Sequence, residues 1–153
     1  MADDPKPFRL AVAGSRHLRD GAFIAAKLSA MLANRLPNVE LGHGGFEGAD
    51  ALADVWALEH LTLPPIILGL GSKGAGKGVT KAGSRELIEW ADAVLAFPLH
   101  PLSLGTQDAI GRAVMTRKPV VAYWLVLDTR GRVVAVKRVN EYGRKPLSKD
   151  VLG

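Results

Sequence analysis

The sequence predicts a three-layer α/β domain with a Rossmann-like parallel sheet and a C-terminal antiparallel edge hairpin. Short apolar runs of strand length alternate with amphipathic segments of helix length along most of the 153 residues, as in parallel βαβ units. Near the C-terminus, the apolar run 119–127 is followed by Asp128-Thr129-Arg130-Gly131, which has the composition of a hairpin turn. We expect one domain, with the sheet in residues 1–127 and a hairpin with a basic tail in residues 128–153.

Each helix and strand is predicted from its apolar spacing and from the residues that end it. Phe8–Ala13 is a short apolar run that leads into a glycine turn, as a buried strand would. Asp20 can cap the helix that follows, whose apolar residues recur on one face, and Pro37 ends it. Ser84 can cap a later, shorter helix. In chain order, the strands are expected at 8–13, 39–41, 64–70, 93–98, 119–127 and 132–139, and the helices at 21–35, 49–60, 84–90 and 106–116.

Residues 71–83 are rich in glycine and lysine and are predicted to form an exposed loop. The stretch GSKGAGKG at 71–78 resembles the phosphate-binding loop of nucleoside triphosphatases. It has Gly78 where that loop needs the Ser or Thr hydroxyl that binds magnesium, so the sequence disfavours a triphosphatase. A flap over an anionic ligand and a loop without a ligand role both fit this composition.

Composition excludes several classes of protein. Hydrophobic residues make up 48% and charged residues 23% of the chain, which is a globular balance. The absence of cysteine excludes disulfide scaffolds, zinc-thiolate sites and cysteine nucleophiles. Two aspartates near the N-terminus stand where a secretory signal carries positive charge, and the apolar runs are shorter than a membrane span. We therefore expect a soluble, cytoplasmic protein, and the spacing of the four histidines predicts no metal site.

The net charge of +5 is unevenly distributed. Residues 118–153 contain eight basic and three acidic side chains, whereas residues 1–117 contain twelve of each. Such a basic segment can attract nucleic acid or an anionic ligand, but a solvated, solubilising extension is the simpler interpretation.

Small and polar residues gather at the C-terminal ends of the predicted strands, where open parallel sheets bind ligands. Three such turns are Gly14-Ser15-Arg16, Gly42–Asp50 and Leu104–Asp108, and each precedes a predicted helix. Backbone N–H groups and the positive ends of the helix dipoles would then face one edge of the sheet, which favours a phosphate or another anion.

The residues in these turns have alternative roles. Arg16 can pair with a phosphate or remain structural, and Asp50 can bind a ribose hydroxyl or cap its helix. His43 can act as an acid or base, or as a hydrogen-bond partner within its turn. Arg85 can bind an anion or form a surface ion pair. The candidate ligand-binding residues are Gly14, Ser15, Arg16, His43, Gly44, Gly45, Asp50, Arg85, Gly105, Thr106 and Asp108.

These segments together resemble the SLOG superfamily, and within it the YspA-like branch. The resemblance rests on Ala13–Arg16, on His43–Ala53 with its H-G-G-x-x-G-A-D pattern, on Ser84-Arg85-Glu86, on Ala91-Asp92 and on Gly105–Asp108. It covers about residues 8–124, and the C-terminal hairpin lies outside it. The resemblance implies a Rossmann-like domain that binds nucleotides or nucleotide-derived ligands. It also implies a homo-oligomer.

Relatives in this superfamily include LOG phosphoribohydrolases, DNA-processing protein A and sensors of NAD-derived signals such as ADP-ribose derivatives. In the LOG branch an arginine and a glutamate serve cleavage of the N-glycosidic bond, and Arg85 and Asp108 occupy roughly those places. The LOG pattern P-G-G-x-G-T is replaced here by Pro98–Thr106, which lacks two of its glycines. We therefore expect binding without a cofactor, in a sensor or sequestering protein, ahead of N-ribosyl hydrolysis. Nucleic-acid binding through the basic segment is the third hypothesis.

Overall fold

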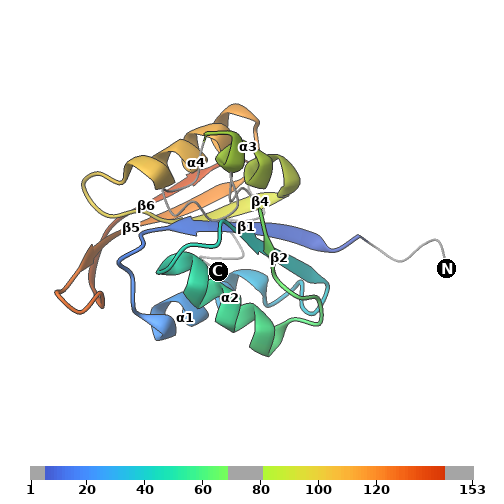
Figure 1. The fold of residues 1–153 in the computed structure, drawn as a ribbon, viewed down its shortest axis with the longest axis horizontal. Helices are drawn as coiled ribbons and strands as arrows, with labels where there is room; N and C mark the ends of the chain where they lie inside the picture. The colour runs from blue at the N-terminus through green and yellow to red at the C-terminus, as the bar shows by residue number, and fades with distance from the viewer. Residues whose placement is uncertain (1–5, 69–80, 144–153) are drawn as a thin grey trace.

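The computed structural model describes residues 6–68 and 81–143 (Figure 1). In these ranges a six-stranded sheet lies between two layers of helices, which confirms the predicted three-layer α/β fold. The elements in chain order are β1 (Phe8–Gly14), α1 (Gly21–Leu32), β2 (Val39–His43), α2 (Ala49–His60), β3 (Ile66–Ile67), α3 (Lys81–Trp90), β4 (Ala93–Phe97), α4 (Leu104–Met115), β5 (Val120–Leu127) and β6 (Val133–Tyr142).

The strand order in the sheet is β3-β2-β1-β4-β5-β6. The first five strands in the chain are parallel, and β6 pairs with β5 in the antiparallel direction. The chain leaves β1 toward β2 on one side and later returns to β4 on the other side of β1. This reversal is a topological switch point, at which the loops after β1 and β4 diverge and leave a crevice.

Both faces of the sheet are covered, which is why β1 is apolar at successive positions. Helices α1 and α2 pack on one face and α3 and α4 on the other (Figure 1). Leu10 and Val12 belong to the cluster on the α1 and α2 side, whereas Ala11 belongs to the cluster beneath α3 and α4. No helix in the described part of the chain has the length and apolar character to cross a membrane.

Several element boundaries differ from the predicted ones. The Asp20 cap is confirmed, since its Oδ1 accepts a hydrogen bond from the Phe23 N–H at 3.1 Å, but α1 ends at Leu32 instead of Arg35. Helix α3 begins at Lys81 and α4 at Leu104, earlier than expected, and β6 continues to Tyr142 because it pairs with the whole of β5. The predicted loop at 71–83 falls mainly on 69–80, outside the described residues.

Gly48 allows the loops after β1 and β2 to meet. Its φ of +77° and ψ of −130° belong to a region that glycine alone populates readily. A Cβ built on Gly48 would lie 2.2 Å from the Ser15 carbonyl oxygen, so the neighbouring backbone would have to move.

We expect Gly48→Ala to lower the free energy of unfolding by about 3 kcal/mol or more, from the strained dihedrals and the backbone clash. Urea unfolding measures this loss. Gly111→Ala is the matched control, because a Cβ there meets nothing within 4 Å. On the helix α4, this control should gain up to about 1 kcal/mol. Equal effects of the two substitutions would contradict this account of Gly48.

Candidate functional site

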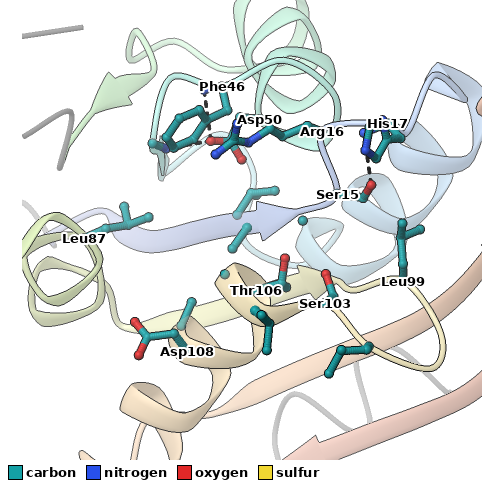
Figure 2. A pocket seen from close by; sticks show the side chains of 18 of the residues that line it. Ser15, Arg16, His17, Phe46, Asp50, Leu87, Leu99, Ser103, Thr106 and Asp108 are labelled. Atoms are coloured by element: carbon teal, nitrogen blue, oxygen red, sulfur yellow. Dashed lines mark hydrogen bonds between the residues drawn. The ribbon is translucent and has the colours of Figure 1, made fainter. Parts of the chain in front are cut away.

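A cleft of about 770 Å³ lies at the C-terminal edge of the sheet, at the switch point between β1 and β4 (Figure 2). One wall carries Arg16, Phe46 and Asp50 from the loops and helix that follow β1 and β2. The other wall carries Ser103 and Thr106 from the start of α4. The three turns predicted to converge therefore do converge on one cavity.

Backbone hydrogen bonds of Ser15 join the turn after β1 to the end of β4 and to the start of α2. The Ser15 N–H donates to the carbonyl oxygen of Phe97 at the end of β4, at 3.1 Å. The Ser15 carbonyl oxygen accepts from the N–H of Ala49, the first residue of α2, also at 3.1 Å. The side chain is used as well, since Ser15 Oγ accepts from the His17 N–H at 3.0 Å. Ser15 is thus buried, and its contacts fix the floor of the cleft.

Asp50 organises the loop between β2 and α2. Its Oδ2 accepts hydrogen bonds from the N–H groups of Gly44 at 2.9 Å and Phe46 at 3.3 Å. Among the described residues, both of its hydrogen bonds fall on this one oxygen, while the side chain also lines the cleft. Burial raises the pKa of the Asp50 carboxyl to about 6, although His43, these hydrogen bonds and Arg16 oppose the shift.

Arg16 is held in the cleft by an aromatic ring. Its guanidinium carbon lies 4.6 Å from the centroid of the Phe46 ring, and the side chain is exposed. Within the described ranges, no protein acceptor takes a hydrogen bond from this guanidinium. Figure 2 shows it beside the Asp50 carboxylate, facing the open cavity. An anionic ligand could therefore use its donors without breaking an existing ion pair.

The opposite wall is the N-terminal turn of α4. Ser103 occupies the N-cap position, but its side chain caps none of the helix N–H groups. Thr106 is 6% exposed, and a Cβ on Gly105 would meet nothing within 4 Å. Asp108 Oδ2 accepts a hydrogen bond from Arg112 Nε at 3.0 Å, one helical turn further on. The start of α4 thus presents uncapped N–H groups across the cavity from Arg16.

Of the predicted site residues, eight line the cleft and three do not. The lining residues are Gly14, Ser15, Arg16, Gly44, Asp50, Gly105, Thr106 and Asp108, and the other three are His43, Gly45 and Arg85. Arg85 is exposed on α3. His43 is buried and its Nδ1 accepts from the Gly45 N–H at 2.9 Å, so the proton on Nε2 is the one directed to Asp54, at 2.6 Å.

Sequence reasoning did not single out the apolar part of the lining. Phe46 stands at an unspecified position of the H-G-G-x-x-G-A-D pattern, although an aromatic ring beside Arg16 is a recognisable platform for a cation. Leucines also line the cavity, and two of them are unusually exposed, Leu102 at 61% and Leu104 at 74%. Apolar side chains left open at a cavity rim are a signal for ligand contact.

Across the described residues, no group of three or more metal-ligating side chains is placed to hold a metal ion.

One of the basic residues in the C-terminal excess is used within the fold. Lys118 donates to the carbonyl oxygens of Ile88, Glu89 and Ala91 at the end of α3. Burial lowers the pKa of this ammonium group. Its charge therefore caps a helix inside the fold.

The fold and the cleft together define a Rossmann-like α/β domain with a cleft at the topological switch point of its sheet. Residues 8–62, from β1 through α2, match the family model described as the YspA, cpYpsA-related SLOG family, which confirms the resemblance in that part of the chain. The structure is similar to DNA processing protein A from Helicobacter pylori, described for its mode of binding single-stranded DNA. The TM-score is 0.57 at 16% identity, over 96% of this chain and 72% of that one. A comparison with curated proteins found no match.

The raised pKa of Asp50 makes a stability prediction. Between its ordinary value of 3.8 and about 6, the folded protein keeps a proton that the unfolded chain has released. The contribution of Asp50 to the free energy of unfolding therefore falls as the pH rises through this window, by about 3 kcal/mol in full. Asp50→Asn removes the titration, so urea unfolding should show this variant gaining on the wild type between pH 4 and pH 7.

A difference between Asp50→Asn and the wild type that stays constant from pH 4 to pH 7 would contradict the buried-carboxylate account.

Proposed function

We propose that the cleft binds a nucleotide-derived small molecule and that the protein serves as a sensor or sequestering protein for it. The observation that carries this proposal is the placement of Arg16 across the cavity from the uncapped start of α4, with Asp50 beside it. A phosphate fits between the guanidinium and the helix N–H groups. The ribose hydroxyls would donate to Asp50, and the base would lie against the leucine side chains of the rim.

Binding is better supported than N-glycosidic hydrolysis. The hydrolase hypothesis gives Arg85 the phosphate and Asp108 the ribosyl centre. A group that must orient water or stabilise a cationic sugar has to be placed on the reacting atoms. Arg85 lies outside the cleft, and Asp108, although it lines the cleft, is already paired with Arg112.

Nucleic-acid binding is a second candidate, because the similar structure is that of a protein described for binding single-stranded DNA. Phosphates of a strand could use the same positive elements as those of a nucleotide. This candidate predicts an affinity that increases with oligonucleotide length and falls steeply with salt concentration. If the cleft takes a single nucleotide, the affinity should instead change little as the oligonucleotide is lengthened.

The first experiment is mass spectrometry of small molecules released when the purified protein is denatured, followed by calorimetric titration with AMP, NAD and ADP-ribose. An intact nucleotide that is released, or that binds on titration, supports the proposal. Free base and ribose phosphate accumulating from added nucleotide would favour the hydrolase. No release and no binding of any of the three would overturn the proposed function.

A pair of glycines on α4 tests whether the ligand occupies the cleft. Gly105 lines the cavity and Gly111 does not, and an added Cβ meets nothing within 4 Å at either position. We expect Gly105→Leu to lower the affinity for the bound nucleotide by about ten-fold or more, since a leucine side chain would fill the space beside the phosphate. Gly111→Leu should bind like the wild type, and both variants should keep the wild-type melting temperature to within a few degrees. Equal affinities of the two variants would place the ligand elsewhere.

A further inference from the structure

A second groove adjoins the cleft, on the other side of the loop that follows β1. It has a volume of about 610 Å³ and shares His17 and Leu99 with the cleft. Its outer wall is the turn between β5 and β6, residues 128–131. This turn lies outside residues 8–62, the part that matches the SLOG family model.

Backbone contacts hold the turn against the loop after β1. The Arg19 N–H donates to the Gly131 carbonyl oxygen at 2.8 Å, and the Val133 N–H donates to Asp20 Oδ2 at 3.1 Å. Gly131 has a φ of +80°, and a Cβ there would lie 2.4 Å from the His17 carbonyl oxygen. On the inner side, the His100 N–H donates to the Leu125 carbonyl oxygen at 2.9 Å. The groove therefore has walls of fixed backbone.

Basic and apolar side chains line the groove in equal number, beside one acidic residue. Four of its residues can carry positive charge, and all are exposed: His17, Arg19, His100 and Arg130. Asp128 is the acidic residue in the lining, and its Oδ1 already accepts the N–H groups of Arg130 and Arg132. Arg19 is paired with Glu47 at 2.7 Å, but Arg130 has no acidic partner among the described residues. An anionic group in this groove would thus meet an unused guanidinium.

The loop after β1 contributes to the lining of both cavities. Arg16 faces the cleft, and the next residue, His17, lines both spaces. A phosphate bound at this loop could therefore carry one nucleoside in the cleft and extend through its second ester bond into the groove.

We infer that the groove is a subsite for the second half of a linear dinucleotide, with a terminal phosphate at Arg130. This inference rests on the proposed nucleotide binding and narrows the ligand class. The first nucleoside occupies the cleft, the linking phosphate lies on the loop at Arg16 and His17, and the second nucleoside extends along the groove. The C-terminal hairpin then distinguishes a dinucleotide from a mononucleotide.

Three adenine probes test the inference by calorimetric titration: AMP, the dinucleoside monophosphate ApA and its 5′-phosphorylated form pApA. The wild type should bind pApA about ten-fold or more tightly than AMP, with ApA weaker than pApA, because only pApA brings a terminal phosphate to the groove. In Arg130→Gln the advantage of pApA over AMP should disappear while the affinity for AMP stays at the wild-type value. Lys137→Gln is the matched control, since it removes one charge from the same hairpin outside the groove and should keep the advantage.

The outcomes separate this inference from the proposed function. Equal affinities of the wild type for AMP and pApA would overturn the subsite and leave nucleotide binding intact. An advantage of pApA that survives in Arg130→Gln would overturn the assignment to the groove. An affinity that keeps rising for oligonucleotides longer than pApA would overturn it in favour of single-strand binding. No binding of any probe would overturn the proposed function and the inference together.

Discussion

The site depends on one close contact between two loops. The Ala49 N–H donates to the Ser15 carbonyl oxygen at 3.1 Å, and this approach leaves no room for a Cβ on Gly48. Gly14 is equally confined, since a Cβ there would lie 2.7 Å from that of Ala49. Because the two backbones are in direct contact, the start of α2 is fixed relative to the end of β1. That contact places Arg16 and Asp50 on the same wall of the cleft.

The buried carboxyl of Asp50 lowers the stability of the folded protein at neutral pH. A carboxyl with a pKa near 6 is costly to ionise at neutral pH, and an apolar residue could fill its space. Its Oδ2 holds the loop through Gly44 and Phe46, and Phe46 in turn supports Arg16. The buried acid therefore helps to position Arg16, because it holds the backbone of the residue whose ring supports the guanidinium. A residue that lowers stability while ordering a cavity wall is typical of a binding site.

The order of the elements and the convergence of the turns could be predicted, because apolar spacing identifies strands and parallel strands end at one edge. The direction of individual side chains could not. Asp50 and Asp54 lie one turn apart on α2, yet the first faces the cleft and the second binds the ring of His43. The direction of Arg85 likewise depends on the rotation of α3, which is set by the burial of its own Leu87 and Ile88 in the core. Sequence spacing leaves such rotations open.

The basic excess near the C-terminus illustrates the same limit with charge. Lys118 caps α3 from within the fold, and Arg138 lies 4.6 Å over the ring of Trp124. Both count toward the net charge, but Lys118 is used by the helix that it caps and Arg138 rests on an aromatic ring. Arg130, at the tip of the hairpin, instead lines the groove, because the turn is held beside the loop after β1. Backbone contacts such as the one at Gly131 therefore decide where a charge of the hairpin lies, and the hairpin turn, which is outside the matched family segment, lines the groove next to the cleft.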